Sequence, residues 1–175
     1  MTEEEARIRS YLEAQGAKLS PAAIVEKVRA AMAELRAAAA SVPPARFHDR
    51  PEPAEWSGNE VMAHVVEAGN HFGGQIVRAL DGLPPVESSG DRSEKPAPRH
   101  TAPEWCAILE RDREALFERV LRADPTARLD KRIEHGMFGT LNWRETLLFL
   151  RLHDLDHAGQ LQKIASALAS SPARG

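Results

Sequence analysis

Residues 142–169 read NWRETLLFLRLHDLDHAGQLQKIASALA, and this stretch decides the fold class. Asn142 is a residue type that caps helices, and Glu145 follows it three residues later, as at many helix starts. Leucine, isoleucine and alanine recur around much of the circumference of the helix that would follow. The stretch therefore predicts one long helix from near Asn142 to about Ala169, which should be the most buried element.

The rest of the chain predicts three more long helices, separated by proline-rich joints. Each begins with a capping hydroxyl and carries apolar residues at helical spacing. They cover residues 20–40, 57–81 and 101–122. Residues 82–100 and 123–140 are predicted to be irregular, with a tight turn or short extended piece at 135–139. Four long amphipathic helices predict an all-α four-helix bundle, in which the two long loops allow non-consecutive helices to be neighbours.

The 175 residues are enough for one well-buried core but not for two full domains. A charged stretch at residues 3–15 is expected to form a short extra N-terminal helix. We expect the domain limits to be an N-terminal extension at 1–19, the bundle at 20–170 and a tail at 171–175.

Charge and hydropathy exclude several classes of partner. The formal charge of −3 gives no electrostatic reason to expect nucleic acid. No apolar run approaches the ~20 residues that cross a bilayer, and the acidic N-terminus is unlike a secretory signal. The single cysteine, Cys106, cannot form an internal disulfide, so we expect a cytoplasmic protein. Cys106 is expected to pack, although the nearby helix N-terminus should favour its thiolate slightly.

Two of the seven histidines stand four residues apart in the last predicted helix. This spacing places His153 and His157 on one face, one turn apart, where both imidazoles can bind the same cation. The face is shared with Leu150 and Leu161, so it should point into the bundle. A hydrogen-bonded pair of core histidines is the alternative. A zinc-protease helix is disfavoured, because that motif needs glutamate where this chain has Asp154.

A metal site needs a further ligand, and the helix at 57–81 offers two candidates. His64 and His71 lie two turns apart on nearly the same face, at the edge of the apolar stripe. Either could equally be a surface histidine. The residues alone therefore leave the choice between them open.

Three motifs together resemble the DinB/YfiT-like family. They are WSGNEVMAHVV at 56–66, HGMFGTL at 135–141 and HDLDHAGQL at 153–161. Their order, separation and placement on helices agree with that family over residues 20–168. The resemblance implies an up-down-down-up bundle that holds a metal with one histidine from 57–81 and two from the last helix. Those residues are His64, His153 and His157, and His71 has no counterpart in the family pattern.

The ligand set and the resemblance together suggest a metalloenzyme. Three neutral imidazoles suit Zn²⁺, Ni²⁺, Fe²⁺ or Mn²⁺ and leave a coordination position open, as in catalytic sites. Gln160, Glu67 and His135 are candidates to support the ligands. The resemblance implies a small-molecule substrate and a transferase that uses a low-molecular-weight thiol. A hydrolase or isomerase, a non-catalytic metal- or small-molecule-binding bundle in a stress response, and a purely structural bundle are the alternatives. A homodimer is a further expectation.

The three tryptophans have a simpler structural interpretation. Trp56 precedes one helix cap and Trp143 follows another, so both are expected to anchor the start of a helix. Trp105 is expected to pack on the helix at 101–122. None of them is taken as a sign of a stacked ligand.

Overall fold

The computed structural model describes residues 1–86 and 95–170. The expected tail at 171–175 and part of the loop at 82–100 lie outside the described residues. The elements are α1 (Glu3–Lys18), α2 (Pro21–Ser41), the short 3₁₀ helix η1 (Pro44–Arg46), α3 (Gly58–Leu80), α4 (Ala102–Leu121), β1 (Ile133–His135), β2 (Gly139–Leu141) and α5 (Trp143–Ser170). No helix among the described residues is both long and apolar enough to cross a membrane.

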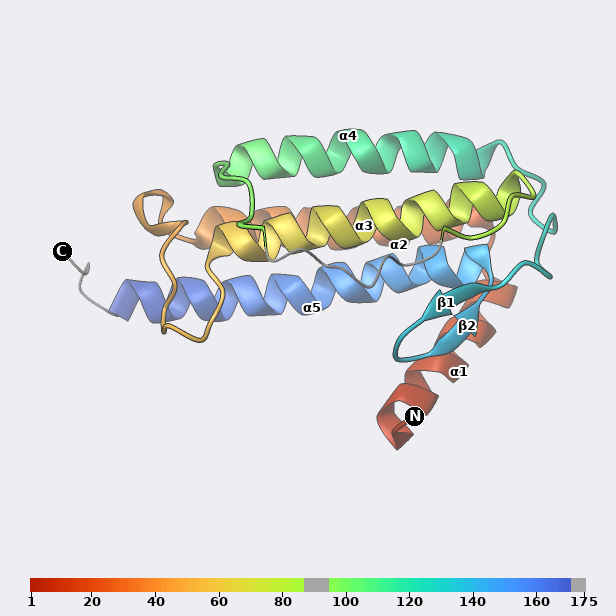
Figure 1. Cartoon of the computed structure of the whole chain (residues 1–175), viewed down its shortest axis with the longest axis horizontal. Coiled ribbons are helices and arrows are strands. Elements are labelled where there is room, and N and C mark those ends of the chain that lie inside the picture. Colours follow the sequence, from red (N-terminus) through yellow and green to blue (C-terminus); the bar gives the residue numbers. More distant parts are fainter. Residues whose placement is uncertain (87–94, 171–175) are drawn as a thin grey trace.

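Four long helices lie side by side in an up-down-down-up bundle (Figure 1). Helices α2 and α5 run in one direction, and α3 and α4 run in the other. Helix α5 packs against α2 and α3, while α4 packs against the same two helices from the other side. Because α3 and α4 run in the same direction, α4 begins at the opposite end of the bundle from the end of α3. This explains why the segment that connects them in the sequence is long. The predicted all-α four-helix bundle is confirmed.

The helix starts follow the caps visible in the sequence. Ser20 accepts a hydrogen bond from a backbone amide of α2, and Ser57 and Thr101 each form a complete capping box. Thr2 forms another with Glu5 at the start of α1, and this helix continues to Lys18, beyond the predicted end at residue 15. Helix α1 is also part of the core, since the Leu12 side chain is fully buried.

Burial along α5 is concentrated at its N-terminal end. Every residue from Trp143 to Leu150 is buried, whereas the second half of the helix buries only one face. The reason is that α1, α2, α3 and the β-hairpin all gather around the N-terminal end of α5 (Figure 1). The expectation of a deeply buried last helix is thus met mainly by its first half.

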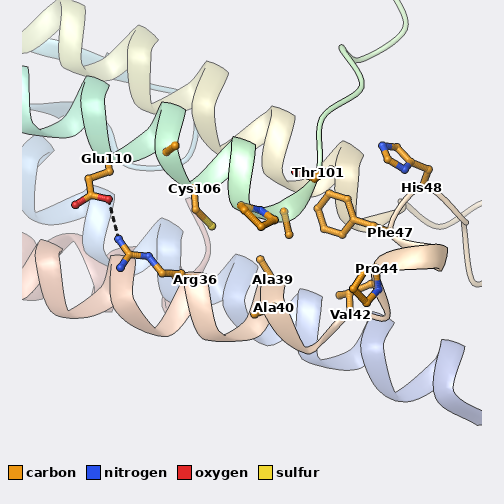
Figure 2. A pocket seen from close by; sticks show the side chains of 13 residues that line it. Arg36, Ala39, Ala40, Val42, Pro44, Phe47, His48, Thr101, Cys106 and Glu110 are labelled. Carbon is orange, nitrogen blue, oxygen red and sulfur yellow. Dashed lines mark hydrogen bonds and ion pairs between the residues drawn. The ribbon is translucent and has the colours of Figure 1, made fainter.

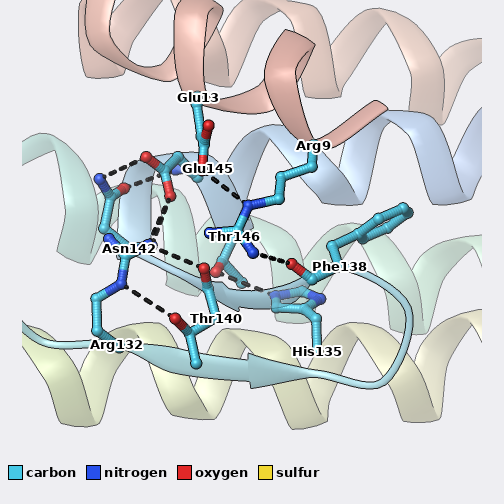
Figure 3. Close-up of polar contacts among 9 residues, drawn as sticks. All are labelled: Arg9, Glu13, Arg132, His135, Phe138, Thr140, Asn142, Glu145 and Thr146. Atoms are coloured by element: carbon cyan, nitrogen blue, oxygen red, sulfur yellow. Dashed lines mark hydrogen bonds and ion pairs between the residues drawn. The ribbon is translucent and has the colours of Figure 1, made fainter. Parts of the chain in front are cut away.

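The predicted short extended piece is a two-stranded antiparallel hairpin, in which Ile133 pairs with Leu141 and His135 with Gly139. Figure 3 shows how it is held against α1 and α5. Arg9 donates to the Phe138 carbonyl at 2.9 Å, and a ring nitrogen of His135 lies 3.2 Å from the Thr146 hydroxyl.

A buried ion pair connects α4 to α5. The Arg113 guanidinium donates two hydrogen bonds of 2.9 Å to the Asp154 carboxylate, and the two side chains are only 2% and 0% exposed. Gly69 of α3 provides the space for it, because a Cβ atom there would lie 3.2 Å from Nε of Arg113. Three helices therefore meet at this pair.

The Gly69 contact can be tested by adding one methyl group. We expect Gly69→Ala to lower the free energy of unfolding by about 1–2 kcal/mol, because the methyl group displaces Arg113 from its buried partner. Gly74→Ala is the matched control on the same helix, since a Cβ atom there meets nothing within 4 Å. It should raise the free energy of unfolding by about 0.5–1 kcal/mol through helix propensity. Urea denaturation measures both, and equal stabilisation by the two variants would contradict the tight contact.

The buried His135 should make stability depend on pH. Burial, together with the nearby charge of His71, lowers the pKa of His135 from 6.5 to about 4. The folded chain keeps this imidazole neutral, whereas the unfolded chain takes up a proton below its ordinary pKa. Acid therefore favours unfolding, and His135 should remove up to about 3 kcal/mol of stability as the pH falls from 6.5 to 4.

The corresponding variant is His135→Gln, which does not titrate and can still hydrogen-bond to Thr146. Denaturation in the presence of a chelator should show a shallower loss of stability with acid than in wild type, whereas the partly exposed His100→Gln should retain the wild-type slope. An unchanged slope in His135→Gln would show that His135 does not cause the effect.

Candidate metal centre

The structure brings three histidines together between α3 and α5. His64 lies in the second turn of α3, and His153 and His157 lie one turn apart in the middle of α5. One ligand nitrogen from each ring can be chosen so that the three atoms lie within 4.8 Å of one another. His71 is exposed and packs its ring on Phe72, 5.0 Å away between centroids. The ambiguity between His64 and His71 is thus resolved geometrically in favour of His64.

The spacing of two of these nitrogens fits a shared cation. Nε2 of His153 lies 3.2 Å from Nε2 of His64. Two imidazole nitrogens bound at about 2.0–2.1 Å to a tetrahedral metal would be separated by about 3.3 Å. The observed separation therefore matches a common chelate geometry, and the donor set of the cluster fits a divalent metal.

Gln160 orients the third imidazole. Its Oε1 atom lies 2.8 Å from Nδ1 of His157. Because an amide oxygen can only accept, this contact places a hydrogen on Nδ1 and leaves the lone pair on Nε2. A hydrogen bond of this kind commonly fixes the tautomer of a metal-binding histidine. The structure therefore gives Gln160, one of the expected supporting residues, a direct contact with the cluster.

His153 is held in its neutral form. Burial, together with the neighbouring His157, His64 and Arg113, lowers its pKa from 6.5 to about 3. A neutral imidazole has a lone pair available for a metal at physiological pH. Nδ1 of His153 is buried and has no hydrogen-bond partner among residues 1–86 and 95–170. The ring orientation is therefore set by the contact with His64 and by packing.

The cluster contacts one buried and one exposed aromatic ring, and we call these its closed side and its open side. On the closed side, Phe149 is only 8% exposed and its ring lies 5.7 Å from that of His153. On the open side, the Trp56 ring lies 5.2 Å from that of His64 and is 40% exposed. His64 and His153 are themselves half-buried, so the cluster is not sealed from solvent, and Trp56 is the exposed ring beside it.

The other two expected supporting residues lie farther away. Glu67 is exposed, and its side chain forms no hydrogen bond or ion pair in the described part of the chain. His135 contacts Thr146 and stacks on Phe72, with ring centroids 4.4 Å apart. Phe149 lies between His135 and the cluster, since it contacts the rings of both His135 and His153. His135 thus supports the packing behind the cluster and makes no ring contact with the three histidines.

Sequence reasoning missed two features of the site. One is the Arg113–Asp154 pair, although Asp154 occupies the apolar stripe formed by Leu150, Ala158 and Leu161 at helical spacing. A carboxylate on a buried face needs a cation, and this was the available signal. The other is Trp56, which does not bury itself as a helix anchor. Trp143, which follows its cap instead of preceding it, is fully buried and donates to a backbone carbonyl.

A separate cavity of about 520 Å³ lies between α2 and α4. Figure 2 shows its lining, with the Arg36–Glu110 ion pair at one end, Cys106 near the middle and His48 at the other end. Burial raises the pKa of the Cys106 thiol, so the expected favouring of the thiolate by the helix N-terminus is wrong. The cysteine packs, as expected, and the histidine cluster is not among the residues that line this cavity.

Comparisons with known proteins agree with this architecture. The crystal structure of TT2238, described as a four-helix bundle protein, superposes with a TM-score of 0.62; the chains are 22% identical over 82% of this chain and 99% of the other. This likeness shows the fold. No curated protein matches the chain. The family model of the DinB superfamily matches residues 15–161, which is most of the sequence. The protein therefore belongs to the DinB superfamily.

Proposed function

We propose that this protein is a divalent-metal-dependent enzyme that transfers a low-molecular-weight thiol to an electrophile. His64, His153 and His157 would hold the metal. The observation that carries the proposal is the three-imidazole cluster, in which His153 contacts the buried Phe149 and His64 contacts the exposed Trp56. A three-histidine set leaves room for an exchangeable ligand, as catalytic metals require.

The proposed metal and the proposed thiol substrate rest on different kinds of evidence. A bound divalent cation would act as a Lewis acid that lowers the pKa of a thiol at the open position. In the transfer, the thiol sulfur forms a bond to the electrophile, the leaving group departs with its electron pair, and the thiol proton goes to solvent. The ligand geometry supports the metal, whereas the thiol class comes from the family resemblance.

The residues around the cluster have distinct tasks in this proposal. Gln160 holds His157 in the tautomer that exposes Nε2. The Arg113–Asp154 pair fixes the rotation of α5, so that His153 faces α3. Phe149 excludes water from the inner side of the imidazoles, which keeps His153 neutral. The chain thus supplies a preorganised donor set in which His153 is neutral at neutral pH.

Metal content tests the ligand assignment. Freshly purified wild type should carry close to one divalent metal per chain by elemental analysis, and His153→Ala should lose most of it, because two imidazoles bind a cation much more weakly than three. His71→Ala is the matched control, since it removes an exposed histidine of α3 that lies outside the cluster. Its metal content should equal that of wild type. Metal-free wild type, or a His153→Ala protein with full metal content, would overturn the assignment.

Turnover separates an enzyme from a binding protein. Metal-loaded protein mixed with a panel of small thiols and a reactive electrophile should consume thiol faster than chelator-treated protein. His153→Ala should reduce this rate at least tenfold, and His71→Ala should not change it. Loss of free thiol groups measures the reaction. If the protein binds metal yet shows no metal-dependent turnover with any thiol, a non-catalytic binding bundle is the better interpretation.

A further inference from the structure

We propose that Trp56 is a specificity-determining residue, which contacts the organic part of a ligand bound at the open side of the histidine cluster and favours aromatic over aliphatic groups. The inference rests on the proposed function, because it takes the cluster to hold a cation with an exchangeable ligand. It adds a residue and a substrate preference to that site.

The first observation is the exposure of Trp56. Trp143 and Trp105 are 0% and 4% exposed, and their indole nitrogens donate to the Ala127 carbonyl and the Asn59 side chain. Trp56 is 40% exposed, and its indole nitrogen donates no hydrogen bond within the described residues. Packing in the core therefore accounts for Trp143 and Trp105. The ring of Trp56 remains partly exposed and could contact a ligand.

The second observation is the position of this face. The Trp56 and His64 rings are 5.2 Å apart between centroids and tilted by 54°. The His64 ring lies 4.9 Å from that of His157, so Trp56 borders the cluster at His64, whereas the buried Phe149 contacts it at His153. A group attached to the open side would extend along the indole. Offset and edge-to-face contacts between aromatic rings form at centroid separations of about 4.5–7 Å, which this arrangement permits.

The third observation is that the segment before α3 is firmly anchored. Ser57 and Glu60 exchange capping hydrogen bonds, and Arg50 donates to Glu60 at 2.8 Å. The Phe47 ring packs so closely on Gly58 that a Cβ atom there would lie 2.7 Å from it. These contacts flank Trp56 on both sides in the sequence. An exposed indole that is held in place loses little entropy on binding a ligand, which is a requirement for a recognition surface.

The test compares two thiols on the cobalt-loaded protein. Cobalt(II) is the probe metal, and the thiolate-to-cobalt absorption band reports binding of benzyl mercaptan or ethanethiol without any turnover. In Trp56→Leu, we expect the preference for benzyl mercaptan over ethanethiol to fall about three- to tenfold, which corresponds to the loss of one aromatic contact. Trp56→Phe should retain most of the preference, because it keeps an aromatic ring at that position.

The control variant is Leu121→Ala, which removes another exposed apolar side chain, at the end of α4. Its preference between the two thiols should equal that of wild type. An unchanged preference in Trp56→Leu would overturn the inference, and so would an equal loss of affinity for both thiols.

Cobalt binding itself separates this result from a failure of the proposed function. If wild type binds no cobalt, as followed by its d–d absorption, the metal site fails and the inference fails with it. If wild type binds cobalt and both thiols but Trp56→Leu keeps the wild-type preference, the metal site stands and only the role of Trp56 is refuted. Cobalt should also quench the emission of wild type more strongly than that of Trp56→Leu.

Discussion

The buried pair of Arg113 and Asp154 is the constraint on which the site depends. Removing two charges from water is costly, and only a bidentate contact with excellent geometry offsets that cost. The pair therefore permits little rotation of α5 relative to α4. Each residue of a helix is rotated by about 100° from the one before it. When Asp154 faces Arg113, His153 and His157 therefore both lie on one side of Asp154 around the helix axis, about 100° and about 60° away from it. That side faces α3 and His64.

The surroundings of the three histidines differ between the buried side of the cluster and the side near Trp56. On the inner side, burial and the Arg113 charge both disfavour protonation of His153. His153 is therefore poised to bind a cation without first releasing a proton, because its pKa lies well below the ordinary value of about 6.5. On the outer side, the anchored start of α3 holds Trp56 beside His64. The three rings thus have a buried aromatic neighbour at His153 and an exposed one at His64.

Much of the fold was predictable because helix signals are local. Serine and threonine caps with a glutamate three residues later marked the starts of α3 and α4, and proline-rich joints marked the ends. The hairpin of β1 and β2 was predicted only as a turn or short extended piece, because its strands are three residues long and are stabilised by contacts from α1 and α5. The length of α1 was underestimated at its C-terminal end, where the buried Gly16 lies against Glu145 of α5, because a contact between distant helices leaves no local signal.

The sequence by itself determined the four amphipathic helices and the shared face of His153 and His157, since both follow from the repeat of a single helix. Whether His64 or His71 joins them did not follow from spacing. The family resemblance favoured His64, and the tertiary structure brings it to the pair through the way α3 lies along α5. The ion-pair partner of Asp154 could not be predicted from the sequence either, since Arg113 lies on another helix and is one of many arginines. The exposure of Trp56 likewise depends on how the chain before α3 folds over the bundle. Local periodicity sets which residues share a face, and packing between distant helices sets what that face meets.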